Sequence, residues 1–172
     1  APDRARPVAT GQLFGQWAGD GGLSVLLGPD SSLGRALANH DDHGADRELA
    51  RWRQVVPDNR IALAVSDHLG RDGEASLPQA VAMVRFADRH RLECVLTNQV
   101  RMARADQAPV CDVLDAARLL QPLTMGRLGL GTGEGWLKPS GQMAAVAARI
   151  SDGAGRDDRG RRLLADTRVL AE

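Results

Sequence analysis

Three short, mostly apolar runs stand out in the hydropathy pattern of the chain, and polar or turn-forming residues bound each of them. They cover residues 23–27, 61–65 and 93–96. Apolar runs of about four to six residues that end at Gly, Asp or Asn are typical of strands buried on both faces of a parallel sheet. The pattern therefore predicts three buried, parallel strands.

Helical periodicity fills the segments that follow these runs. Apolar residues recur at three- and four-residue spacing over residues 45–56, 77–87 and 110–117. Such a stripe is typical of a helix that packs one face on a core. Because strands alternate with helices, we expect right-handed crossovers and an α/β structure with a parallel sheet or barrel over residues 1–122.

The organisation of the chain changes after this α/β region. Residues 123–139 are rich in glycine and show no sustained period, which predicts a linker. The alternating glycines do not form a dinucleotide-binding fingerprint, because no strand precedes them. Two amphipathic helices are expected in residues 140–172, the first of them beginning near Ser140 as its N-cap. The sequence offers these helices no partner, so we expect them to begin a following domain.

Charge and composition narrow the classes of partner. The 22 basic and 22 acidic side chains cancel to a formal net charge of zero. The chain therefore has no overall field that would hold a nucleic-acid backbone or an anionic membrane, and any contact with DNA must be local. No apolar run approaches the roughly 20 residues of a membrane helix, and the first residues contain no signal-peptide core. We expect a cytoplasmic protein with no membrane partner.

The two cysteines, Cys94 and Cys111, carry no sign of a metal site. They show neither the CxxC spacing nor the Cys/His spacing that would predict zinc. Free cysteine is also among the residues most often found in protein interiors. Both are therefore expected to be small buried apolar residues.

Two polar stretches have a structural interpretation that we prefer to a chemical one. Asp30, Ser31 and Ser32 follow the first apolar run, at a point where the amino end of a helix could hold an anion. We favour Ser31 or Ser32 as an N-cap, because Asp30 would repel an anion. The stretch NHDDHG, residues 39–44, is expected to be a solvated loop between two helices.

Candidate chemistry gathers after the second and third apolar runs. Asp67 and His68 follow the second run, and Asn98, Arg101 and Cys111 follow the third. The carboxyl ends of parallel strands are where ligands and catalytic groups gather in α/β proteins. Asp67 and His68 have the chemistry of a metal ligand or a general base, but a metal site takes about three or four protein ligands. Asn98 is expected to fix the loop that follows its strand.

Four stretches of the chain, in this order and spacing, carry a family resemblance: GLSVLLGPDSSLGRAL, LARWRQVVPDNRIALAVSDH, CVLTNQVRMARADQAPVCDVLDAARLL and EGWLKPSGQMAAVA. Together they resemble the second half of the PHP (polymerase and histidinol phosphatase) domain of bacterial C-family DNA polymerases. They are closest to the error-prone branch of that family, which carries out translesion synthesis. The resemblance implies a partial PHP-type (β/α)7 barrel with parallel strands, followed by a helical linker region.

The resemblance also implies that the metal site of this family is degenerate here. Ala64 stands where metal-binding members have Glu, Arg101 and Cys111 stand where they have His, and only His68 matches a ligand position. A protonated guanidinium and a lone thiol do not restore a site for a hard metal. We therefore expect His68, Arg101 and Cys111 to be remnants of a site with no metal, no cofactor and no catalytic residue. For Arg101 we favour a contact with a carboxylate of the same domain over one with a DNA phosphate.

By resemblance, the chain is a segment of an error-prone DNA-directed DNA polymerase, a nucleotidyltransferase of DNA replication and DNA repair. The segment itself would be a non-catalytic scaffold, attached to the remainder of the polymerase chain. The parent enzyme would use Mg²⁺ and would work with DNA, the sliding clamp and translesion accessory proteins. Two alternatives stay open: a free-standing PHP-like phosphoesterase that uses Asp67 and His68 with a metal, and a small module that binds another replication protein.

Overall fold

The computed structural model describes residues 10–19, 23–70, 75–123 and 133–172. Three strands, β1 (Val25–Leu27), β2 (Ile61–Val65) and β3 (Glu93–Leu96), form one parallel sheet in the order β1-β2-β3. The three predicted strands and their parallel direction are thus confirmed. Among the described residues the sheet has three strands and is not closed, so the predicted partial barrel stays a prediction.

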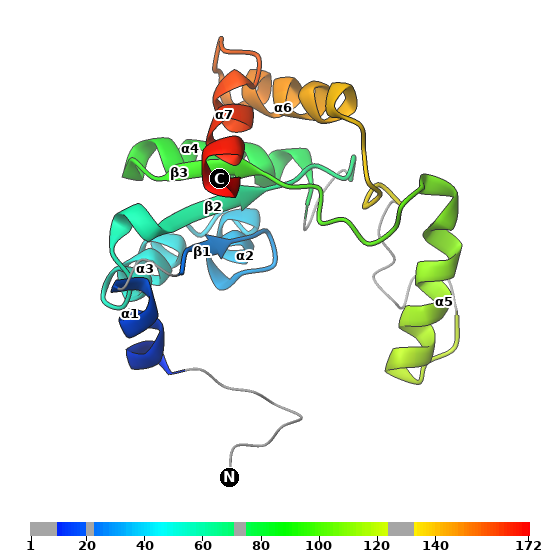
Figure 1. Cartoon of the computed structure of the whole chain (residues 1–172), viewed down its shortest axis with the longest axis horizontal. Coiled ribbons are helices and arrows are strands. Elements are labelled where there is room, and N and C mark those ends of the chain that lie inside the picture. The colour runs from blue at the N-terminus through cyan, green and yellow to red at the C-terminus, as the bar shows by residue number, and fades with distance from the viewer. Residues whose placement is uncertain (1–9, 20–22, 71–74, 124–132) are drawn as a thin grey trace.

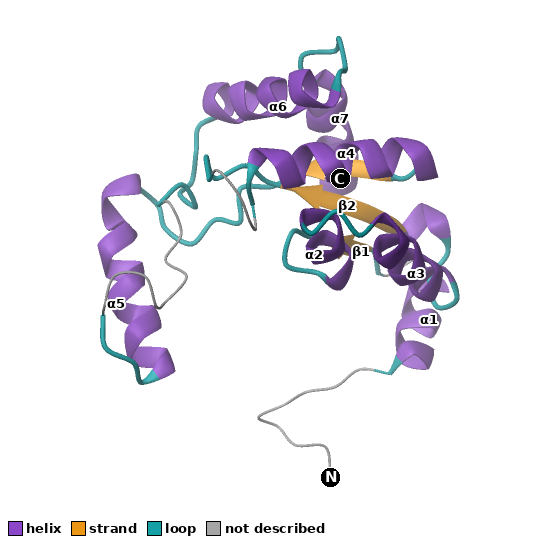
Figure 2. Ribbon diagram, turned by 180° about the vertical axis from the view of Figure 1, so that it is seen from behind, coloured by secondary structure: helices purple, strands orange, loops and turns teal. Residues whose placement is uncertain are grey.

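Helices surround this sheet on several sides. In chain order the helices are α1 (Gly11–Gly19), α2 (Ser32–Ala38), α3 (Asp42–Arg53), α4 (Leu77–His90), α5 (Ala108–Leu119), α6 (Ser140–Ala154) and α7 (Arg161–Ala171), with short 3-10 turns η1 (Asp58–Arg60) and η2 (Ala105–Gln107). In Figures 1 and 2, α6 and α7 lie next to α4, α2 and α3 lie near β1, and α5 stands apart from both groups. Within the described ranges, no helix has the length and apolar character needed to cross a membrane.

The turn after β1 follows from local hydrogen bonding. Ser31 is the N-cap of α2, since its hydroxyl oxygen accepts a hydrogen bond from the Gly34 backbone N–H at 3.0 Å. The Ser31 hydroxyl also donates to the Gly28 carbonyl at 2.6 Å. A Cβ atom at Gly34 would lie 2.4 Å from the same carbonyl oxygen, so this position requires glycine. The N-cap interpretation of the serines is confirmed at Ser31.

One predicted loop and one predicted N-cap were wrong, although the helix expected near Ser140 does begin there. The NHDDHG stretch is not a loop throughout, because Asp41 caps α3 by accepting a hydrogen bond from the Gly44 backbone N–H at 2.8 Å. Asp42 therefore begins the helix, where its carboxylate suits the positive end of the helix dipole. At α6 the N-cap is Pro139, and Ser140 is the first helical residue.

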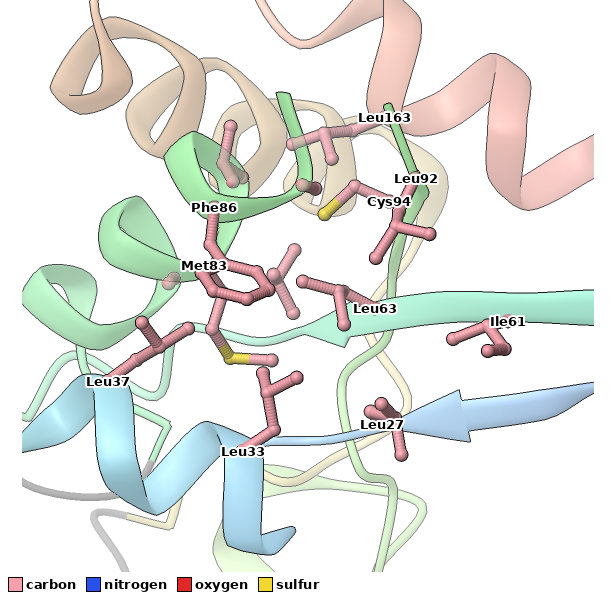
Figure 3. Close-up of a cluster of buried hydrophobic side chains, with 14 of the residues drawn as sticks. Leu27, Leu33, Leu37, Ile61, Leu63, Met83, Phe86, Leu92, Cys94 and Leu163 are labelled. Carbon is pink, nitrogen blue, oxygen red and sulfur yellow. The ribbon is translucent and has the colours of Figure 1, made fainter. Parts of the chain in front are cut away.

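The hydrophobic core forms where the three strands meet α2, α4, α6 and α7. Figure 3 shows its central side chains, which include Leu33 and Leu37 from α2, Leu63 from β2, Met83 and Phe86 from α4, and Leu163 from α7. Phe86 and Leu63 are completely buried. Burial of this apolar surface supplies most of the driving force for folding. The same cluster contains Cys94, so the prediction of a buried apolar cysteine is confirmed at that position.

The two carboxyl-terminal helices, for which the sequence offered no partner, pack on α4 and β3. Arg85 of α4 donates a hydrogen bond to the Gly153 carbonyl of α6 at 3.0 Å. The Thr167 hydroxyl of α7 accepts one from the Leu96 backbone N–H of β3 at 2.8 Å. Gly160 joins the helices with φ +78, where a Cβ atom would lie 2.4 Å from the Ala147 carbonyl carbon. The predicted linker over residues 123–139, with a separate domain after it, stays a prediction. In the structure, side chains of α6 and α7 belong to the same hydrophobic core as the sheet.

Helix α5 exposes an apolar stripe. Val110, Val113 and Leu114 lie on one face of the helix and are all exposed, and Leu120 just beyond its end is 93% exposed. Single exposed apolar residues are common on protein surfaces, but contiguous apolar patches mark contacts with other protein. We call these four residues the α5 stripe.

Replacing Leu114 of the α5 stripe by glutamine is expected to change the free energy of unfolding by less than about 0.5 kcal/mol, because the side chain is already 62% exposed and the two residues have similar helix propensities. Urea denaturation followed by circular dichroism measures this change. The matched control is Leu137→Gln, at a leucine that is 64% exposed outside any helix. A loss well above that of the control would contradict the exposure of the stripe.

Candidate functional site at the strand ends

Three buried polar side chains mark the carboxyl ends of β2 and β3. Ser66 and Asp67 follow β2, and Asn98 follows β3. All three are buried. A buried polar group costs stability unless it finds a partner, so the partners of these side chains indicate what this edge of the sheet does.

Asp67 forms an ion pair that connects the end of β2 with α6. Its Oδ1 atom accepts a hydrogen bond from the Leu69 backbone N–H at 2.9 Å, and its Oδ2 atom lies 3.2 Å from the Nε atom of Arg149. The contact between Arg149 and the Oδ2 atom lacks the alignment of a hydrogen bond, so it stabilises the carboxylate by charge attraction alone. The carboxylate is completely buried, whereas the Arg149 side chain is 43% exposed. Arg149 therefore supplies the counter-charge of a buried anion.

His68 connects the ends of β2 and β3. Its Nε2 atom lies 2.9 Å from the Asn98 carbonyl oxygen. A carbonyl oxygen only accepts hydrogen bonds, so Nε2 carries the hydrogen in this arrangement. The backbone N–H of His68 also donates to the Ala75 carbonyl at 2.7 Å. His68 thus acts as a connection between two strand ends.

Asn98 holds the segment that leads to α6. Its Nδ2 atom donates hydrogen bonds to the carbonyl oxygens of Glu134 at 2.9 Å and Trp136 at 2.6 Å. Its Oδ1 atom accepts one from the Lys138 ammonium at 3.3 Å. Lys138 is only 5% exposed and forms an ion pair with Glu134 at 3.0 Å. Asn98 therefore fixes a later segment of the chain and not only the loop that follows β3.

Residues 133–138, which belong to the predicted linker, lie against the loop after β3 and are joined to it by backbone hydrogen bonds and one isolated β-bridge. The Arg101 backbone N–H donates to the Gly135 carbonyl at 2.7 Å, and the Leu137 N–H donates to the Met102 carbonyl at 3.0 Å. Met102 and Trp136 form a parallel β-bridge. The Lys138 ammonium lies 5.5 Å from the centre of the Trp136 ring, within cation–π range. We call residues 133–138 the strap. Residues 124–132 of the predicted linker lie outside the described residues.

The three remnant positions predicted from the resemblance come together around one small pocket. His68, Arg101 and Cys111 line it together with Asp112, and its volume is about 50 Å³. Arg101 forms an ion pair with Asp115 of α5 at 2.7 Å, and the Cys111 thiol donates a weak hydrogen bond to the Arg101 carbonyl at 3.8 Å. A pocket of this size holds on the order of one or two water molecules. This volume is far below the roughly 300–1,000 Å³ that is typical of small-molecule sites.

The side chains at the strand ends do not fit the metal cluster that the resemblance implies. Asp67 is paired with Arg149, and Arg101 brings a positive charge where a cation would have to bind. Over residues 10–19, 23–70, 75–123 and 133–172, no three His, Cys, Asp or Glu side chains are grouped so that they could hold a metal ion. This donor set favours internal ion pairs over a divalent cation.

No protein-family model and no curated protein matches the chain. The family resemblance is therefore a prediction that rests on the four sequence motifs. Since a fold hosts many unrelated functions, the function has to be argued from the contacts at the strand ends and from the exposed surfaces.

The two cysteines differ in environment, contrary to the prediction that both are buried. Burial raises the pKa of the Cys94 thiol to about 12. Cys111 is only half-buried, because α5 stands apart from the core. The thiolate is the reactive form of cysteine, so burial and a raised pKa both protect Cys94.

Iodoacetamide at pH 8 is expected to alkylate Cys111 in the folded protein and to leave Cys94 unmodified until denaturant is added. Mass spectrometry of the two cysteine-containing peptides measures both reactions. A Cys111→Ser variant provides the control, since its folded form should take up no label. Equal labelling of both thiols in the folded protein would contradict the burial of Cys94.

Proposed function

We propose that the chain is a segment of a cytoplasmic error-prone C-family DNA polymerase, in which part of a PHP-type (β/α)7 barrel acts as a non-catalytic scaffold. The observation that carries this proposal is that Asp67, Asn98 and Arg101, at or after the strand ends, have partners within the chain. Asp67 holds α6, Asn98 holds the strap, and Arg101 holds α5. Groups bound in this way stabilise an arrangement of helices.

The same contacts argue against a catalytic role for this edge of the sheet. Metal-assisted phosphoryl chemistry needs several carboxylate or imidazole ligands that converge on one cation, often with a second cation nearby. Here the buried carboxylate of Asp67 is neutralised by Arg149, and the pocket beside His68 is only about 50 Å³ in volume. A scaffold needs neither a free metal ligand nor a substrate pocket, so both features are compatible with that role.

The α5 stripe supports the second part of the proposal, that further protein packs against this segment. In the parent polymerase the stripe would contact the remainder of the polymerase chain. The proposal assigns nucleotide transfer, with its Mg²⁺ ions and DNA contacts, to that remainder, together with contacts to the sliding clamp and to translesion accessory proteins. This chain contributes shape and stability.

The test of the non-catalytic part is an assay of the whole 172-residue chain with Mn²⁺, Mg²⁺ or Zn²⁺. The substrates are p-nitrophenyl phosphate and a labelled single-stranded oligonucleotide. We expect no metal-dependent hydrolysis above the background of a His68→Gln variant, and no metal retained in stoichiometric amount after dialysis. Hydrolysis that needs the metal and disappears in the variant would support a free-standing phosphoesterase in place of the scaffold.

The test of the parent polymerase is an immunoblot of a lysate of the source organism after DNA damage, with an antibody against this chain. We expect one band several times larger than 18.4 kDa. A band at 18.4 kDa would contradict the polymerase segment. It would favour a small interaction module, which the exposed α5 stripe also suits.

A further inference from the structure

A second cavity lies apart from the strand-end side chains, between α1, α2 and α3 and beside the end of β1. Its volume is about 510 Å³, and neither Asp67, His68 nor Asn98 lines it. Cavities of roughly 300–1,000 Å³ that combine apolar walls with a few polar groups are typical of small-molecule sites. The α1 pocket, as we call it, falls in this class by size and by lining.

The walls of the α1 pocket are apolar and partly aromatic. Phe14 of α1, Leu27 of β1, and Trp52 and Val55 from α3 and its end supply them. The Phe14 and Trp52 rings meet edge to face, with their centroids 6.1 Å apart and an angle of 90° between their planes. Edge-to-face and offset contacts are the arrangements that aromatic rings prefer, so an aromatic ligand could extend this pair.

The rim of the α1 pocket carries one positive charge that no carboxylate neutralises. Arg51 is paired with Glu48 at 2.6 Å. Arg35 of α2 donates a hydrogen bond to the Asp30 carbonyl oxygen and, within the described part of the chain, makes no ion pair. The Asp30 side chain does not line the pocket. The lining therefore holds two guanidinium groups against one carboxylate, with Arg35 left to meet an anion.

We propose that the α1 pocket binds a small aromatic carboxylate, with its ring against Phe14 and Trp52 and its carboxylate on the Arg35 guanidinium. A guanidinium presents two parallel N–H donors, which match the two oxygens of a carboxylate. Apolar walls next to this group favour a ligand in which the ring and the acid are close together. This inference does not depend on the polymerase proposal, because Asp67, Asn98 and Arg101, which carry that proposal, do not line the α1 pocket.

Binding of 1-naphthylacetate to the whole chain, measured by isothermal titration calorimetry, tests the proposal. Its uncharged amide, 1-naphthylacetamide, has nearly the same ring and shape. We expect the acid to bind about tenfold more tightly than the amide, since only the carboxylate forms a bidentate ion pair with the guanidinium. Equal affinities would overturn the assignment of the carboxylate to Arg35, and failure of both compounds to bind would overturn the site.

Two arginine variants place the effect in the pocket. Arg35→Gln removes an exposed guanidinium, so the fold should be unaffected, and we expect about tenfold weaker binding of the acid with a smaller change for the amide. Arg47→Gln is the matched control, because Arg47 is an exposed arginine of α3 outside the pocket lining. An equal effect of the two variants on the acid would show that general charge attracts the ligand, and would overturn the proposed site.

Discussion

Replacing Arg149 by methionine is expected to lower the free energy of unfolding by about 3 kcal/mol, because it leaves the buried Asp67 carboxylate without a counter-charge. Breaking a buried ion pair by removing one partner costs roughly 3–5 kcal/mol, and the partial exposure of Arg149 puts the expected loss at the lower end. Methionine keeps the apolar stem of the side chain. Urea denaturation followed by circular dichroism measures the loss.

Two further variants separate the buried charge from general effects of losing an arginine. Arg47→Met removes an exposed arginine whose nearest carboxylate, Asp41, lies 3.8 Å away, and the expected loss is below about 0.5 kcal/mol. Adding Asp67→Asn to Arg149→Met should recover part of the 3 kcal/mol, because the neutral amide still accepts the hydrogen bond from Leu69. An Arg149→Met variant as stable as the Arg47→Met control would contradict the role assigned to the pair.

The sequence predicted two of the strands well, because local composition sets their boundaries. The runs at residues 61–65 and 93–96 are strands with the same bounds in the structure, since apolar residues end there at polar ones. The start of α3 was missed, although a signal was present: an Asp three residues before Gly44, whose backbone N–H reaches the carboxylate. Capping depends on a single hydrogen bond, which periodicity does not detect.

The candidate site was predicted only in part, because its contacts join distant segments of the chain. Asp67 and Asn98 stand out in the sequence as polar residues at strand ends. Their partners, Arg149 and the strap, carry no local signal, because a helical arginine and a glycine-rich stretch read as solvent-exposed. The resemblance marked Arg101, but its partner Asp115 also emerges only when α5 is placed in space.

Replacing Asn98 by alanine is expected to lower the free energy of unfolding by about 2–3 kcal/mol and to release the strap. The change removes two hydrogen bonds to strap carbonyls and one from Lys138, and each contributes on the order of 1 kcal/mol. The backbone N–H groups of Arg101 and Leu137 should then lose their protection from hydrogen exchange, because both donate across the strap. Hydrogen exchange of these two amides and urea denaturation measure the two effects.

The control for this prediction is Asn59→Ala, at an exposed asparagine of η1 where the loss should stay within about 0.5 kcal/mol. A difference between the two variants in stability without a difference in exchange would mean that Asn98 stabilises the sheet and not the strap. Protected amides at Arg101 and Leu137 in Asn98→Ala would therefore contradict the docking role. Loss of protection that is confined to the strap, with the amides of β2 unchanged, would show that the Asn98 side chain is needed to hold the predicted linker in place.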